Sequence, residues 1–111
     1  MRIFPDLLED KTPGEEFNKS QEFTDEIPTS DSIRAVGGMS GTTVVAEDQD
    51  GTDVSSSVVL NKVVSGTKLQ ARLKIPSGEN VYLVTYTTQM ANSQELFKKY
   101  LIVRVRTPKA I

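Results

Sequence analysis

Hydrophobic and polar residues alternate in short runs along the chain from residue 31 onward. The clearest run is residues 67–74, where apolar positions alternate with basic or polar ones. The apolar positions are Leu69, Ala71 and Leu73, and the others are Lys68, Gln70, Arg72 and Lys74. A period of two places the two sets on opposite faces of a β-strand. This segment therefore predicts a half-buried strand with a basic outer face.

Five further segments are β-branched or alternating and end at turn signals. They are residues 32–36, 42–46, 54–64, 80–89 and 95–106. Strands that recur every roughly 8–12 residues, with turns between them, are typical of antiparallel sandwiches. No long segment shows the period of a helix. We therefore predict an all-β fold, an immunoglobulin-like antiparallel β-sandwich of about seven strands.

The first twenty residues have a different character. They are polar and acidic, with Pro5 and the turn signal Thr12-Pro13-Gly14. We predict an extended N-terminal arm over residues 1–20, followed by the immunoglobulin-like domain over residues 21–111. The arm is either a solvated tail or a segment that docks on a neighbouring subunit. The candidate subunit contacts are Phe4, Leu7 and Leu8 in the arm and Met39 in the glycine-rich loop 37–41.

The segment from Gly78 to Val84 carries a second indication of this fold. In immunoglobulin-like sandwiches, a tyrosine near the start of the penultimate strand bonds its hydroxyl to nearby backbone, and an inward residue follows two positions later. Tyr82 and Val84 have this spacing. We favour Tyr82 as this corner residue over an ordinary strand aromatic. The predicted core contains Leu69, Leu73, Tyr82, Val84, Leu101 and Val103.

The chain contains no histidine, cysteine or tryptophan. It therefore lacks the commonest general base, the commonest metal ligand and the best nucleophile, and zinc sites and histidine-dependent triads are excluded. The carboxylate pairs Glu15-Glu16 and Asp25-Glu26 are adjacent in sequence, so on a strand they face opposite ways. We predict a non-enzymatic protein with no catalytic residues, no cofactor and no metal.

Neither a signal peptide nor a membrane span is predicted, because the first residues are followed by acidic ones and the longest apolar runs are short.

Charge is unevenly distributed along the chain. Residues 1–56 carry 4 Lys/Arg and 13 Asp/Glu, a net of −9, whereas residues 57–111 carry 9 and 2, a net of +7. If these charges interdigitate in the fold, they cancel. If they lie on separate faces, they form a dipole suited to salt-sensitive head-to-tail stacking. We favour the first alternative.

Three local features have a specific and an ordinary interpretation. The acidic segment 48–53 loosely resembles a calcium loop, but no glutamate follows at the required spacing, so an acidic turn is favoured. The loop 37–41 carries no Lys-Ser/Thr, so it is a connector and not a phosphate cradle. The basic residues are predicted to pair with the acidic part and not with nucleic acid. They are Lys68, Arg72, Lys74, Arg104 and Arg106.

The chain resembles the small immunoglobulin-like virion proteins of tailed bacteriophages at several residues with the same spacing. In the first part these are Lys11, Pro13 and Glu15, then Phe23, Asp25 and Ile27, then Asp31 and Ile33. In the second part they are Ser65-Gly66-Thr67, then Gly78, Tyr82, Val84 and Thr85, then Leu101, Val103 and Val105. The resemblance covers roughly residues 10–106.

This resemblance implies an oligomeric fibre–tail adaptor or a head–neck component that is assembled in the host cytoplasm and resides in the virion. Its partners would be copies of itself and other phage structural proteins of the tail, fibre, neck or capsid. Neither nucleic acid nor membrane is an expected partner. The alternatives are a capsid decoration protein and a module that binds carbohydrate or a cell surface. A carbohydrate module would require clustered exposed aromatics, and the chain has seven aromatic residues in all, 4 Phe and 3 Tyr.

Overall fold

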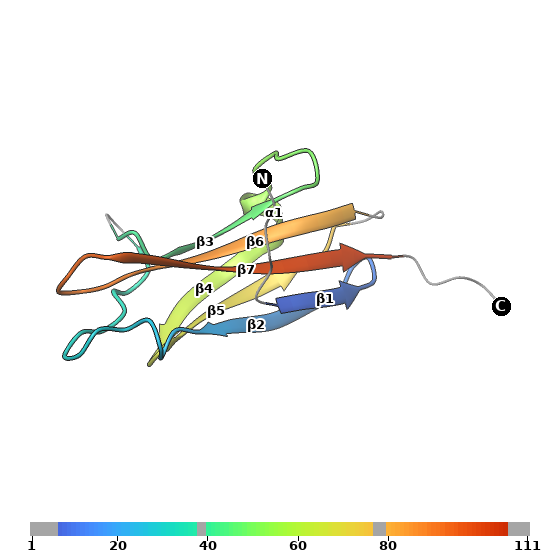
Figure 1. Ribbon diagram of the computed structural model, residues 1–111. Coiled ribbons are helices and arrows are strands. Elements are labelled where there is room, and N and C mark those ends of the chain that lie inside the picture. Colours follow the sequence, from blue (N-terminus) through green and yellow to red (C-terminus); the bar gives the residue numbers. More distant parts are fainter. Residues whose placement is uncertain (1–6, 38–39, 77–79, 107–111) are drawn as a thin grey trace.

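A computed structural model describes residues 7–37, 40–76 and 80–106, with the backbone alone at Leu8. These residues form seven strands and one helical turn in two layers (Figure 1). The elements are β1 (Leu7–Lys11), β2 (Glu16–Glu22), β3 (Thr43–Glu47), α1 (Ser55–Val58), β4 (Val59–Ser65), β5 (Lys68–Lys74), β6 (Asn80–Gln89) and β7 (Leu96–Val105). The predicted all-β sandwich of about seven strands is confirmed.

The two sheets have the strand order of an immunoglobulin-type sandwich. One sheet has the order β1-β7-β6-β3 and the other the order β2-β5-β4. When the strands are lettered A to G along the chain, these orders contain the G-F-C and B-E-D neighbours of that fold. The first strand departs from the purely antiparallel prediction, because β1 pairs in parallel with β7. Every other strand pair is antiparallel.

The core lies between the facing sides of the two sheets. On β5, Leu69, Ala71 and Leu73 are completely buried, as their alternation predicts. All six predicted core residues lie there, and the most accessible of them, Tyr82, is 4% exposed. The remaining core residues are Phe23, Ile33, Val44, Ala46, Val58, Ile75, Tyr86, Met90 and Val105. Burial of such side chains contributes on the order of 1.5–3 kcal/mol each and is the main stabilising contribution in a domain of this size.

The separate arm predicted over residues 1–20 is wrong where the structure describes it. Residues 7–11 form β1, whose backbone pairs with β7, and residues 16–22 form β2, which pairs with β5. The side chains of β2 that face the core are Phe17, Lys19 and Gln21, so only one of them is apolar. The segment therefore lacks the hydrophobic alternation that marks a strand, and its place comes from pairing with distant strands.

Two other predicted strand segments also differ from the structure. Residues 32–36 contribute only one isolated bridge, between Ile33 and Met90. The start of segment 54–64 is the helical turn α1, not strand. There, the Asp53 carboxylate accepts hydrogen bonds from both the N–H and the hydroxyl of Ser55. Such local side-chain bonding favours a turn over an extended strand.

Candidate interaction surface

The acidic and basic parts of the chain interdigitate in the fold. Acidic β1 and β2 lie beside basic β7 and β5, and three ion pairs join the two parts. They are Asp10–Arg104, Glu16–Arg72 and Glu26–Lys99. The Asp10 carboxylate accepts two hydrogen bonds from Arg104, at 2.9 and 3.1 Å, which hold its pKa below the usual value. The favoured prediction, that the charges of the two halves interdigitate in the fold, is therefore confirmed for these pairs. Head-to-tail stacking would require the two charges on separate faces, which these pairs do not show.

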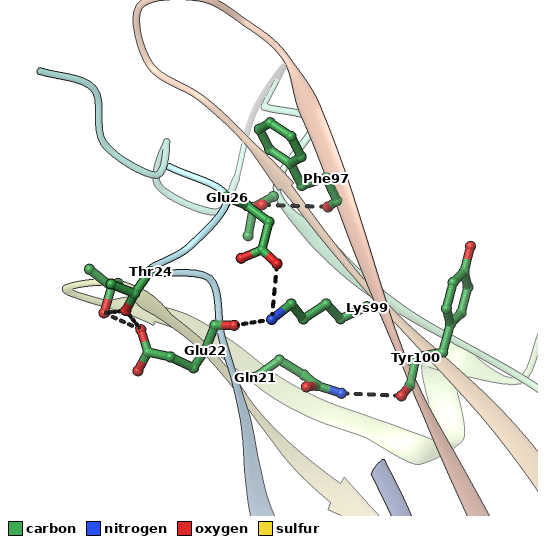
Figure 2. Close-up of polar contacts among 9 residues, drawn as sticks. Gln21, Glu22, Thr24, Glu26, Phe97, Lys99 and Tyr100 are labelled. Atoms are coloured by element: carbon green, nitrogen blue, oxygen red, sulfur yellow. Dashed lines mark hydrogen bonds and ion pairs between the residues drawn. The ribbon is translucent and has the colours of Figure 1, made fainter. Parts of the chain in front are cut away.

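Polar contacts join the edge strand β2 and the loop after it to β7 of the opposite sheet (Figure 2). Lys99 extends from β7, and its ammonium group donates to the Glu22 carbonyl and pairs with Glu26 at 3.2 Å. The Gln21 amide donates to the Tyr100 carbonyl at 3.3 Å. Unpaired edge groups invite pairing with another chain, and the bond from Lys99 occupies one such carbonyl, at the end of β2. The Gln21 bond uses a side chain of β2 and fastens this strand to the opposite sheet.

Inward-pointing lysines close the two open sides of the sandwich. Lys19 reaches from β2 to the Glu9 carboxylate on β1. Lys62 reaches from β4 to the Thr43 hydroxyl on β3, at 3.1 Å. An inward charge on an edge strand is a recognised device against edge-to-edge association. Strand edges are thus less available for association than sheet faces.

The cross-sheet tyrosine hydrogen bond lies at Tyr86, not at the predicted Tyr82. The Tyr86 hydroxyl donates to the Lys19 carbonyl at 3.0 Å, and the ring is completely buried. Burial raises the pKa of Tyr86 above its usual range. Tyr82 is also in the core, but its hydroxyl makes no hydrogen bond within the described residues. Both tyrosines face inward on β6, and only Tyr86 faces a carbonyl of β2.

Asp31 joins two loops at one end of the sandwich. Its carboxylate accepts hydrogen bonds from the backbone N–H groups of Asn92, Ser93 and Ser32 at 2.8–3.1 Å. These donors, led by Asn92, lower the pKa of Asp31 from 3.8 to about 2. Two residues later, Ile33 is buried beside Met90. The acidic residue and isoleucine of the phage-like pattern therefore hold the β6–β7 turn in place.

We expect Asp31→Ala to lower the melting temperature at neutral pH by an amount that shrinks in acid. A carboxylate with a lowered native pKa stabilises the fold above its unfolded pKa and loses this effect as pH falls through its native pKa. The difference between wild type and variant should therefore decline between pH 3.8 and about pH 2. Thermal unfolding followed by circular dichroism from neutral pH to below pH 2 measures this. A difference that stays constant across this range would contradict the assigned role.

Glu15 and Phe23, two further residues of that pattern, also have structural roles. The Glu15 carboxylate accepts from the Thr12 N–H at 2.6 Å, which closes the β1–β2 turn and lowers the pKa of Glu15. The Glu15 carbonyl accepts from the N–H of Ile75 at 2.9 Å, so the turn is fastened to the end of β5. Phe23 is completely buried directly after β2. These two residues of the phage-like spacing therefore stabilise a turn and the core of the sandwich.

The acidic segment 48–53 uses its carboxylates within its own turn. Asp48 accepts from the N–H groups of Asp50 and Thr52 at 2.9 and 3.0 Å. Asp53 bonds to Ser55, which lowers the pKa of Asp53. Among the described residues, no group of three or more acidic side chains is placed to hold a metal ion. This geometry agrees with the favoured acidic turn.

The outer faces of the two sheets differ in chemistry. On the three-stranded sheet, β2 and β5 point alternate polar or charged residues outward, as expected for a solvated face. On the four-stranded sheet, the outward positions at the centre are largely apolar or β-branched. They are Val45 of β3, Leu83 and Thr85 of β6, and Tyr100 and Ile102 of β7, all half-buried. We call these five residues the outer apolar face, and it is the candidate interaction surface.

None of the four predicted subunit contacts is among the five residues of the outer apolar face. Phe4 and Met39 lie outside the described residues, as does the side chain of Leu8. Leu7 is partly buried and packs against the core of its own chain, and its role as a subunit contact stays a prediction. The outer apolar face was missed in the sequence, although the uninterrupted apolar runs in β6 and β7 carry its signal. Strands buried on both faces show such runs, whereas half-solvated strands alternate.

An open hollow of about 260 Å³ lies at the end of this sheet. It is lined by Gln49, Asn80, Val81, Arg104, Val105 and Arg106. Of its two arginines, Arg104 is already paired with Asp10. The charge of Arg106 also acts on the Asp10 carboxylate, whose pKa Arg104 and Arg106 both lower, so we assign the hollow no chemistry.

Comparison with known proteins adds no family assignment. No protein-family model matches the chain, and no curated protein matches its sequence. Within the described parts of the chain, no helix is long and apolar enough to cross a membrane.

Proposed function

We propose that this protein is a non-enzymatic structural component of a tailed-bacteriophage virion, an oligomeric adaptor that joins parts of the tail, fibre or neck. The observation that carries the proposal is the location of the phage-like residues. Glu15, Phe23 and Asp31 hold a turn, a core position and a loop junction of one continuous sandwich. These three residues of the phage-like spacing each stabilise the sandwich, which is what we expect if the chain shares its fold with those phage proteins.

The capped edges and the outer apolar face support an interaction role. A sandwich whose strand edges are blocked can associate in a defined way through a sheet face. The five residues of the outer apolar face offer a continuous contact area without dedicated chemistry. Function then depends on this surface and not on a reacting group.

The alternative, a carbohydrate-binding module, is less well supported by the aromatic residues. Phe23, Tyr82 and Tyr86 are buried, and Phe17 and Phe97 pack against the core. Of the described aromatics, this leaves Tyr100 on the outer face of the sheet. Stacking on sugar rings needs a cluster of accessible aromatic rings, so a protein contact fits these positions better.

Purified phage particles test the proposal. If the chain is a virion component, peptides from it should be found by mass spectrometry in particles purified by density gradient. Particles from phage that lack the gene should be missing a tail, fibre or neck part in electron micrographs, and expression of the chain in trans should restore it. Particles that contain no trace of the chain and assemble normally without it would contradict the proposal.

A further inference from the structure

We propose that β1 is a salt-sensitive strap, held on the sandwich mainly by charged side chains, which opens as a unit while the other strands stay folded. Its hinge lies directly after Lys11, where β1 ends. The inference goes beyond the proposed function and does not depend on it, because it concerns one strand pairing within a single chain. Salt then controls whether the edge of β7 is closed.

The side chains of β1 give it little apolar attachment. This strand lies at the edge of the four-stranded sheet, beside β7 (Figure 1). The register turns Leu7, Glu9 and Lys11 toward the opposite sheet, because their partners on β7 are buried core residues. Only Leu7 among these three is apolar, and it is partly buried. Burial of apolar surface therefore contributes little to holding β1 in place.

Three consecutive charged residues attach β1 to both sheets. Two of them contact β2 and the third contacts β7, and the pairs are Glu9–Lys19, Lys11–Phe17 and Asp10–Arg104. The Lys11 ammonium lies 4.2 Å from the centre of the Phe17 ring, a distance at which a cation is attracted to the ring face. The Asp10 carboxylate accepts its two bonds from Arg104 at 2.9 and 3.1 Å. Charge thus takes the place that apolar packing has on the central strands.

The charged groups that hold β1 are accessible to solvent. The side chain of Asp10 is 59% exposed and that of Arg104 is 38% exposed, whereas Glu9 and Lys19 are 26% and 27% exposed. Dissolved ions screen such charges, and the Debye length falls from about 30 Å at about 0.01 M salt to about 3 Å at about 1 M. Screening does not weaken the burial of apolar side chains. Salt should therefore loosen β1 selectively.

The strand at the other edge of the same sheet is held differently. Like β1, β3 has five residues, but its inward side chains Val44 and Ala46 are completely buried. The Ala46 N–H donates to the Ser55 hydroxyl, and the Ala46 carbonyl accepts from the N–H of Val54. None of the ion pairs among the described residues involves β3. It also pairs antiparallel, whereas the parallel pairing of β1 is slightly less stable per residue.

The turn that follows β1 is anchored independently of it. The Glu15 carboxylate closes this turn by accepting from the Thr12 N–H. The Gly14 N–H donates to the Ile75 carbonyl at 3.0 Å, and the Ile75 N–H donates to the Glu15 carbonyl at 2.9 Å. The turn is thereby fastened to the end of β5, and β2 after it pairs with β5 along its whole length. Opening is therefore confined to residues 7–11.

Hydrogen exchange of the folded chain, followed amide by amide by NMR at constant pH, tests the strap. Local opening makes the paired amides of a strand exchange faster than those that require global unfolding. The paired amides of β1 should therefore exchange faster than those of β3. Raising NaCl from about 0.01 M to about 1 M should speed the exchange of β1 about fivefold and that of β3 less than about twofold, since three exposed charge contacts account for an effect of this size.

A charge-neutral double variant separates charge from packing. Glu9→Gln combined with Asp10→Asn keeps the shape of both side chains and removes both carboxylate charges. The β1 amides should then exchange about fivefold faster at low salt and lose most of their response to NaCl. The matched control is Glu16→Gln combined with Glu26→Gln, which removes two carboxylates whose ion pairs do not involve β1. It should leave the exchange of β1 as in wild type.

Several outcomes would overturn the proposal. One is a set of β1 amides that exchange as slowly as those of β3, and another is a salt response shared equally by all strands, which indicates global unfolding. If the double variant leaves the exchange of β1 unchanged, backbone pairing and Leu7 hold the strand, and the strap is wrong. An equal effect of the control variant would also contradict it, because the charges on β1 would then have no special role.

Discussion

Phe23→Ala is expected to lower the free energy of unfolding by about 3–5 kcal/mol, a large part of the stability of a domain of this size. Phe23 is completely inaccessible and sits where β2 passes into the loop that leads to Asp31. Its ring also lies beneath the Lys99 ammonium, 5.3 Å from the ring centre. Truncation removes this packing and leaves a cavity between the sheets. Urea unfolding monitored by circular dichroism measures the loss.

Phe97→Ala is the matched control for Phe23→Ala. Phe97 is the same residue type and packs against the same core, but it is only partly buried. Solvent can fill the space it leaves, so its removal should cost clearly less. If the two variants lost equal stability, or if Phe23→Ala cost under about 1 kcal/mol, Phe23 would not be the interior anchor assigned here.

Tyr86→Phe is expected to lower the free energy of unfolding by about 1 kcal/mol, although it removes a single oxygen atom. That hydroxyl is the donor to the Lys19 carbonyl of β2 and joins the two sheets through the core. The Lys19 carbonyl also faces Ala71 in the ladder with β5, so the variant loses the net contribution of one hydrogen bond and does not leave the carbonyl without a donor. Equilibrium unfolding in urea at neutral pH measures the change.

Tyr82→Phe is the control that separates the two tyrosines. Its hydroxyl makes no hydrogen bond to a described residue, so the substitution should stay within about 0.5 kcal/mol of wild type. A larger loss at Tyr82 than at Tyr86 would restore the corner role that the spacing predicted for Tyr82. The pair therefore tests one sequence-based prediction directly against one structural observation.

The strands with the strongest alternation were predictable almost to the residue. The segments 67–74, 80–89 and 95–106 correspond to β5, β6 and β7. Each buries a continuous set of apolar side chains, so its own pattern defines which face turns inward. β1 and β2 had no such pattern. They are held by backbone pairing to strands tens of residues away, and a local reading therefore placed them outside the domain.

The interaction surface was harder to predict than the core. Tyr100 to Val103 is an apolar run, which a local reading assigns to burial without saying on which face. Only the register shows that Ile102 lies beside Leu83 and away from the core. The predicted contacts were instead drawn from apolar residues near the N-terminus and in a glycine-rich loop. Of these, Leu7 belongs to the chain's own packing.

The sequence by itself determined the class of fold, the core positions of the central strands and the exclusion of histidine and cysteine chemistry. Composition and a period of two are local properties, and they need no knowledge of which strands meet. The tertiary structure alone decided which charges pair, which tyrosine hydroxyl finds an acceptor and which sheet keeps an apolar outer face. Each of these depends on residues far apart in the chain, such as Tyr86 and Lys19 at a separation of 67 positions. Strand pairing and register bring them together, and no local pattern encodes that.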